Sequence, residues 1–191
     1  MFEALFVSTS IVTLAEIGDK TQLLAFILAA RFRKPVPIIA GILVATVLNH
    51  ALAAILGNHV AGYFSETTLL WILAASFLAV AAWTLIPDTM DDEGGLLSQY
   101  GPFVASLVAF FIAEMGDKTQ IATVMLAAQY PALLAVIVGT TLGMLLANVP
   151  VVLVSNFAAA RLPLTLIRSL AALCFLFMAL YAAARALGWA G

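Results

Sequence analysis

Six long apolar stretches take up nearly the whole chain. Each is about twenty residues or longer, enough for a helix to cross roughly 30 Å of hydrocarbon. The expected spans are residues 4–29, 35–57, 66–87, 102–128, 131–157 and 163–187. Only 9% of the residues are charged, too few to build the polar shell of a soluble protein of this size. The sequence therefore predicts an all-α integral membrane protein, one bundle of six transmembrane helices.

The chain repeats itself at an offset of 98 residues. The octet "AEIGDKTQ" at 15–22 returns as "AEMGDKTQ" at 113–120, and the same offset aligns Phe77 with Phe175. A three-span unit crosses the membrane an odd number of times, so the second copy must enter from the opposite side, and we expect the two motifs to face each other. The expected parts are a first three-helix repeat at 1–87, an acidic cytoplasmic linker at 88–101 and a second, inverted three-helix repeat at 102–191.

Basic residues outside the motifs gather on one side of the predicted bundle. Five of them flank two turns on that side: Arg31, Arg33, Lys34, Arg161 and Arg168. The opposite side holds Arg185. Because cytoplasmic turns carry the excess of Lys and Arg, these two turns are expected in the cytoplasm. The sequence thus predicts a multi-pass protein of the inner (cytoplasmic) membrane with both termini outside.

Each motif places two acids and a lysine inside an apolar span. On a continuous helix at about 100° per residue, Glu16, Asp19 and Lys20 share one face. An ionised carboxylate in hydrocarbon costs about 3 kcal/mol, so such residues face the interior and serve function. Over both copies, four acids stand against two lysines. The paired motifs therefore carry two negative charges in excess, which one divalent cation or two protons would balance.

The residue types of the motifs suit a hard cation. Carboxylate, amide and hydroxyl oxygens bind Mg²⁺, Ca²⁺ and Mn²⁺, and neither copy has the Cys or His cluster expected for zinc or copper. The candidate metal ligands are Glu16, Asp19, Glu114 and Asp117. The candidate supporting residues are Lys20, Thr21, Gln22, Lys118, Thr119, Gln120, Ser8 and Ser106. We expect the lysines to pair with the carboxylates when no metal is bound. Because protons compete with metal ions for carboxylates, such a site predicts exchange of a metal ion for protons. We expect no resident cofactor.

Several residues near the motifs allow more than one interpretation. Gly18 and Gly116 either unwind the helix locally or allow close helix packing. His50 has no histidine at its offset partner, so we interpret it as a polar residue at a pore edge or interface. Pro150 lies inside the fifth span, where it should kink or break the helix.

The motifs resemble those of a known family. Two copies of E-x-G-D-K-[TS], present here as "EIGDKT" (16–21) and "EMGDKT" (114–119), are similar to those of cation/proton antiporters in the lysine exporter superfamily. That family includes Golgi manganese and calcium transporters and bacterial manganese exporters. The resemblance implies export of Mn²⁺, with Ca²⁺ as a second candidate, in exchange for H⁺ by alternating access, the motif acids forming the ion site. It implies a transporter rather than an enzyme, with the lipid bilayer, a divalent metal ion and protons as partners and no nucleic acid.

Two other functions and a structural role stay open at this point. The acids would also suit export of a basic amino acid or another organic cation. A metal-dependent lipid-phosphate hydrolase would need Arg or His near the acids, and neither motif contains one. The pair Glu16 and Lys20, four residues apart, could neutralise itself and only hold helices together. Its recurrence in a second copy, again with an acid in excess, argues against that role.

Overall fold

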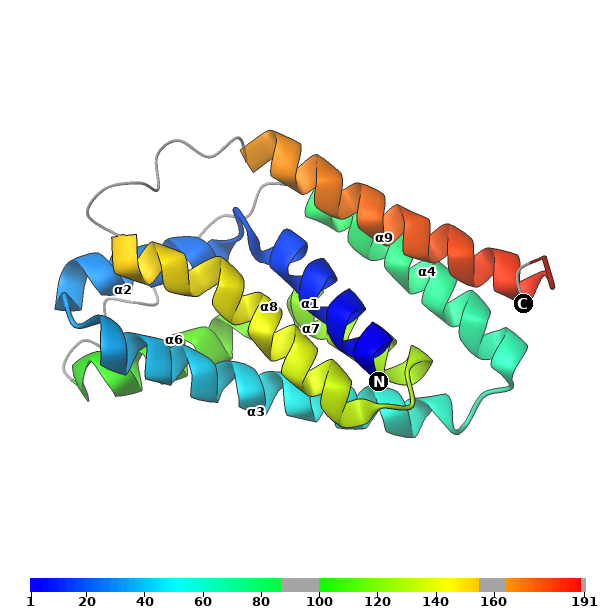
Figure 1. The fold of residues 1–191 in the computed structure, drawn as a ribbon, viewed down its shortest axis with the longest axis horizontal. Coiled ribbons are helices and arrows are strands. Elements are labelled where there is room, and N and C mark those ends of the chain that lie inside the picture. The colour runs from blue at the N-terminus through cyan, green and yellow to red at the C-terminus, as the bar shows by residue number, and fades with distance from the viewer. Residues whose placement is uncertain (87–99, 155–163, 190–191) are drawn as a thin grey trace.

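The computed structural model describes residues 1–86, 100–154 and 164–189 (Figure 1). These residues form α1 (Phe2–Glu16), α2 (Lys20–Phe32), α3 (Pro35–Ala61), α4 (Glu66–Thr84), α6 (Gly101–Glu114), α7 (Lys118–Gln129), α8 (Leu133–Val154) and α9 (Leu164–Ala186). Within the described ranges, α3, α4, α8 and the 169–186 part of α9 are each long and apolar enough to cross a membrane. The all-helical prediction is confirmed. The expected linker at 88–101 falls almost entirely outside the described residues.

The first and fourth expected spans are each broken in two at the motif. Three residues separate α1 from α2, and another three separate α6 from α7. The continuous helix on which the shared face of the motif residues was drawn is therefore wrong, and local unwinding, one of the two interpretations of the motif glycines, is confirmed. Gly18 and Gly116 have φ angles of 83° and 75°, which a helix does not use and which glycine adopts without steric cost. A Cβ added to Gly116 would meet no atom within 4 Å, so Gly116 unwinds the chain and does not serve close packing.

The second helix of each half packs on the other half through a glycine. A Cβ on Gly41 of α3 would lie 2.8 Å from the Cβ of Ser106 in α6. A Cβ on Gly139 of α8 would lie 2.9 Å from that of Ser8 in α1. The two contacts involve residues related by the same offset of 98. The sequence repeat is thus also a repeat of contacts.

The third helices of the two halves, α4 and α9, lie side by side (Figure 1). The rings of Phe77 and Phe175, again related by the repeat offset, stack with centroids 6.3 Å apart and an interplanar angle of 27°. Both rings are buried in an apolar cluster to which α1, α4, α7 and α9 contribute most residues, with additions from α3 and α8. A second apolar cluster joins α2, α3 and α6. Each broken helix contributes one piece to each cluster, so the polar motifs lie between two apolar layers.

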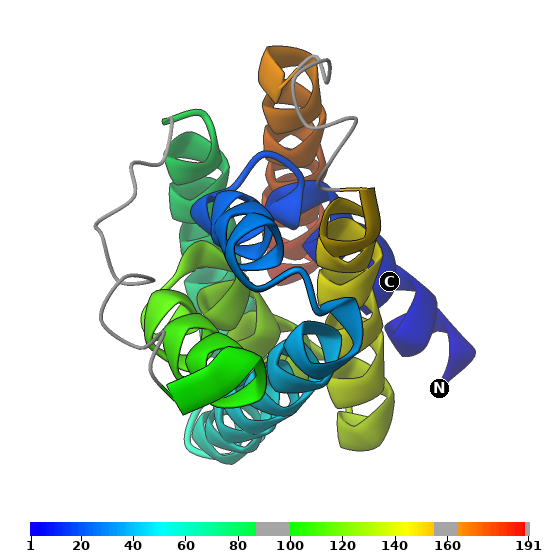
Figure 2. The ribbon, with the colours of Figure 1, turned by 90° about the vertical axis from the view of Figure 1, so that its left-hand side faces the viewer.

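The two broken helices run in opposite directions. Figures 1 and 2 show α1 and α2 leading towards the end of the molecule where α2 meets α3, and α6 and α7 leading away from it. Their breaks therefore meet in the middle of the bundle. Elsewhere Pro35 is the first residue of α3, as the sequence suggested. The helix α8 runs from Leu133 to Val154 through Pro150, so of the kink or break expected at this proline the break is not found.

Candidate functional site

The two breaks bring the charged residues of the motifs together across the halves. Lys20 Nζ lies 3.4 Å from Asp117 Oδ1, and Lys118 Nζ lies 3.1 Å from Asp19 Oδ2. These crossed ion pairs confirm that the two motifs face each other. They also confirm that the lysines pair with motif carboxylates. Because the aspartate partner of each lysine belongs to the opposite motif, the pairs link the two halves rather than neutralise each motif separately.

Each aspartate stands at the start of the helix that follows the break. Asp19 is the N-cap of α2, and its side chain accepts a hydrogen bond of 2.7 Å from the backbone N–H of Lys20. Asp117 holds the same position before α7. Short polar residues are favoured at this position, where a helix leaves N–H groups unpaired. The local fold thus fixes both aspartates at the ends of α2 and α7 that face the centre.

The motif glutamines stabilise the unwound segments. Gln22 Oε1 accepts a hydrogen bond of 2.9 Å from the N–H of Gly18, and Gln120 Oε1 accepts one of 2.7 Å from Gly116. Gln22 Nε2 also donates to the carbonyl of Ala147 in α8, at 3.1 Å. The side-chain oxygens of both glutamines are therefore engaged with the backbone of the break.

The glutamates carry the negative charge that the lysines leave unbalanced. Glu16 and Glu114 are both fully buried, and the ion pairs of 3.4 and 3.1 Å join the lysines to the aspartates. Glu16 Oε1 accepts a hydrogen bond of 3.3 Å from Asn148 Nδ2. Glu114 Oε2 accepts one of 2.8 Å from the hydroxyl of Thr119, which is also 3.4 Å from Asp117 Oδ2. Each glutamate thus accepts a hydrogen bond from a neutral donor, the Asn148 amide or the Thr119 hydroxyl.

The supporting residues expected from the sequence differ in where they lie. Thr119 contacts the acids, whereas the Thr21 hydroxyl is buried with no hydrogen-bond partner among the described residues. Ser8 lies two turns before Glu16 on α1, a rise of about 12 Å, and packs against α8. Ser106 donates to the carbonyl of Pro102 in its own helix. The structure thus places the two serines in helix contacts and not beside the acids.

Asn148 and His50 belong to the interior, which the sequence interpretation missed. Asn148 of α8 contacts Glu16, and its offset partner in α3 is His50. His50 has no exposed surface, so the interpretation of it as an interfacial residue is wrong, whereas its place at the edge of a pore stays a prediction. His59, by contrast, is exposed and lies 3.1 Å from the hydroxyl of Tyr63. The sequence did carry a signal for this place, because the second helix of each half has a polar residue at the same repeat position.

The charges are close together, but a metal centre is not already assembled. In the described part of the chain, no group of three His, Cys, Asp or Glu side chains is arranged as the ligands of one ion. The reason is visible in the ion pairs, because each aspartate is turned towards a lysine. The geometry is that of a site in which ammonium groups supply the positive charge.

Comparisons with known proteins cover both halves. The family model described as "Divalent cation/proton antiporter GDT1" matches residues 4–92 and 102–189. The chain is 60% identical over 181 residues to the "Putative manganese exporter" of Vibrio cholerae, covering 94% of this chain and 90% of that protein. It is 30% identical to GDT1-like protein 3 of rice, covering 75% of this chain and 60% of that protein. GDT1-like protein sll0615 of Synechocystis is 29% identical, covering 85% and 87%. No solved structure matches.

Proposed function

Because the chain belongs to the divalent cation/proton antiporter family GDT1, we propose that it exports Mn²⁺ from the cytoplasm in exchange for H⁺. Ca²⁺ is a second candidate substrate, since the same oxygen ligands serve both ions. The name of the Vibrio cholerae relative supports manganese. The family is one of transporters of divalent cations and protons, which favours this function over a lipid-phosphate hydrolase or an exporter of basic amino acids.

The observation that carries the proposal is the pair of crossed ion pairs, in which the lysine of each motif pairs with the buried aspartate of the other motif. Four acids and two lysines belong to the motifs at the breaks, and each lysine forms an ion pair with an aspartate. The fully buried Glu16 and Glu114 are therefore the groups that a cation or protons must balance. We propose that an entering metal ion binds these glutamates, displaces the lysines from Asp19 and Asp117, and recruits the aspartates as ligands. Protons return to the acids when the ion leaves.

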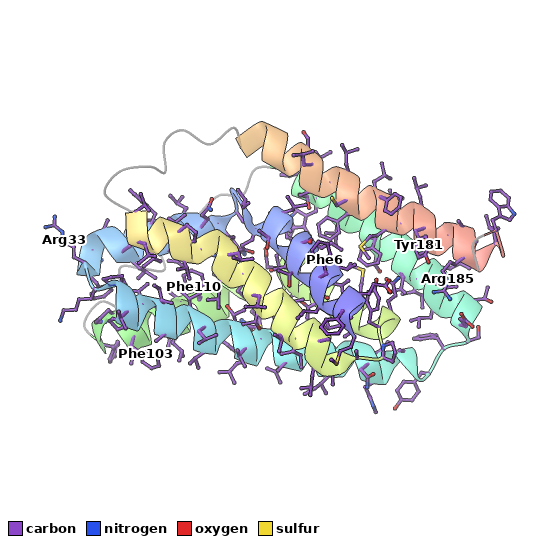
Figure 3. All side chains as sticks on the ribbon, in the orientation of Figure 1. Phe6, Arg33, Phe103, Phe110, Tyr181 and Arg185 are labelled. Atoms are coloured by element: carbon purple, nitrogen blue, oxygen red, sulfur yellow. The ribbon has the colours of Figure 1, made fainter. Side chains whose placement is uncertain are left out.

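The membrane arrangement that we propose has six spans in two inverted three-helix repeats. In it α1 with α2 forms one span and α6 with α7 another, each interrupted near the middle of the membrane. Broken helices at the interface of inverted repeats are a common way to build ion sites in secondary transporters. Arg33 and Arg185 lie at opposite ends of the molecule, as Figure 3 shows. The basic turn at Arg33 supports a cytoplasmic location for that end, with both termini outside.

Unequal exposure of the two lysines supports alternating access. The Lys20 side chain is 28% exposed, whereas that of Lys118 is 2% exposed. Since the two lysines are equivalent in the repeat, an exchange of conformations between the halves would expose Lys118 and bury Lys20. We propose that these two arrangements are the two access states of the site.

Flux measurements test the site assignment. In proteoliposomes, Mn²⁺ transport by the wild-type protein should require a pH gradient. Glu16→Gln and Asp117→Asn should each abolish it, because each removes a charge that the ion needs. The matched control is Glu66→Gln, since Glu66 is an exposed acid paired with Arg185 at 3.1 Å, away from the motifs. Full transport in either motif variant would overturn the site assignment.

A further inference from the structure

His50 and Asn148 hold equivalent places in the two halves. They are separated by the repeat offset, and the helices that carry them make equivalent contacts: α3 packs on α6 at Gly41, and α8 packs on α1 at Gly139. Asn148 Nδ2 is 3.3 Å from Glu16 Oε1. The same relation in the other half places His50 on the side of α3 that faces Glu114.

Contacts along α3 show independently which part of α6 and α7 lies beside His50. The neighbouring side chain of Asn49 donates a hydrogen bond of 3.1 Å to the carbonyl of Phe111, about one turn before Glu114 at the end of α6. Two turns further along α3, Gly57 closely approaches the backbone of α7. His50 therefore lies where α6 ends and α7 has yet to begin, at the level of the second motif break.

The polar atoms at this place are not satisfied by the described residues. Neither ring nitrogen of the fully buried His50 has a hydrogen-bond partner there, and neither has Glu114 Oε1. The Asn148 amide nitrogen, in contrast, donates to both Glu16 and the carbonyl of Met144, while its oxygen is unpartnered. Buried polar groups without partners are rare, and each calls for an explanation such as an ion that completes the site.

We propose that His50 supplies an imidazole nitrogen ligand to the transported ion beside Glu114, and that this nitrogen sets the preference for Mn²⁺ over Ca²⁺. This inference rests on the proposed function, and it names His50 as a residue that determines which ion the protein transports. Ca²⁺ and Mg²⁺ take oxygen ligands in proteins. Mn²⁺ also favours oxygen ligands, but as a first-row transition metal it accepts an imidazole nitrogen among them more readily than Ca²⁺ does. The equivalent position in the other half offers the amide oxygen of Asn148. The two halves thus contribute unlike ligands to one ion.

Exchanging the two residue types tests the proposal. Binding of Mn²⁺ and of Ca²⁺ to the purified full-length protein is measured by isothermal titration. In His50→Asn, which installs the residue of the equivalent position, the Kd for Mn²⁺ should rise by at least about tenfold, because even residues that only orient metal ligands contribute that much. The Kd for Ca²⁺ should not rise. Asn148→His should shift the preference further towards Mn²⁺. The matched control His59→Asn alters an exposed histidine and should change neither constant.

A spectroscopic measurement on the wild-type protein does not depend on any variant folding. Pulsed electron paramagnetic resonance of bound Mn²⁺ should show the nuclear modulation of an imidazole nitrogen, retained in His59→Asn and lost in His50→Asn. Mn²⁺ bound without this nitrogen signal, or a Mn²⁺ to Ca²⁺ preference unchanged in His50→Asn, would overturn the role of His50 alone. A wild-type protein that binds neither ion would overturn the proposed function and this inference with it.

Discussion

At the residue scale, Lys20 and Lys118 are chemically identical but sit in different surroundings. The Lys118 side chain is 2% exposed and pairs with a buried aspartate, whereas the Lys20 side chain is 28% exposed. Removing one partner of a buried ion pair costs about 3–5 kcal/mol, because the other charge stays buried without compensation. Lys20 also pairs with a buried aspartate, since the Asp117 side chain is 1% exposed, but water reaches Lys20 and screens this pair, and pairs in contact with water are worth about 0–1 kcal/mol. The two lysines should therefore contribute unequally to stability in the absence of metal.

This inequality can be measured by thermal unfolding in detergent. Lys118→Met should lower the free energy of unfolding by about 3 kcal/mol and Lys20→Met by about 1 kcal/mol, read as a larger fall in melting temperature for Lys118→Met. Added Mn²⁺ should recover more stability in Lys118→Met, since the ion replaces the missing ammonium group beside Asp19. Lys34→Met, at an exposed lysine before α3, serves as the control. Equal losses in the two motif variants, or no recovery with Mn²⁺, would contradict the description of the lysines as substitutes for the ion.

At the element scale, the decisive feature is the break in each of two helices. Gly116 has a φ angle of 75°, which costs other residues about 1–2 kcal/mol. A Cβ there would touch nothing within 4 Å, so a substitution would act through the backbone angle alone. Gly188, after α9, has a φ angle of 74° and equally open surroundings. It offers a matched control outside the motifs.

We expect Gly116→Ala and Gly188→Ala to lose similar stability, about 1 kcal/mol each, because the strain is the same. Only Gly116→Ala should slow Mn²⁺ transport, since alanine favours a continuous helix through the motif and draws Asp117 away from its position at the start of α7. Parallel measurements of melting temperature and of proteoliposome flux separate the two effects. Transport at the wild-type rate in Gly116→Ala would show that the break is not needed for function.

The sequence predicted the apolar spans and the meeting of the motifs, because hydropathy and an internal repeat can both be read from the sequence without knowledge of tertiary contacts. It left the breaks open, because local unwinding was one of two interpretations of Gly18 and Gly116. No proline interrupts either octet, and a single glycine is compatible with an intact membrane helix. The break around Gly18 is held by contacts between distant segments, such as Gln22 with Ala147 and Lys20 with Asp117. The place of His50 likewise follows from the packing of α3 on α6.

At the scale of the whole molecule, the orientation in the membrane decides which end of the bundle faces the cytoplasm. The helix α3 has 27 residues, which gives a length of about 40 Å, more than the roughly 30 Å of hydrocarbon. Val36 and Tyr63 lie at its two ends and are 76% and 73% exposed. They must therefore reach opposite faces of the membrane. In the proposed topology, the basic turn that precedes Pro35 predicts that the Val36 end faces the cytoplasm.

Cysteine labelling in spheroplasts tests this orientation. The chain has one natural cysteine, Cys174, so Cys174→Ala provides a background without thiols. On that background Tyr63→Cys should react with a membrane-impermeant maleimide added outside, whereas Val36→Cys should react only after the membrane is permeabilised. Both substitutions lie outside the motifs, so the labelled proteins should still transport Mn²⁺. The opposite labelling pattern would place the turn at Arg33 outside and the termini in the cytoplasm. The proposed topology would then be wrong, and the assignment of export would lose the support of the basic turns.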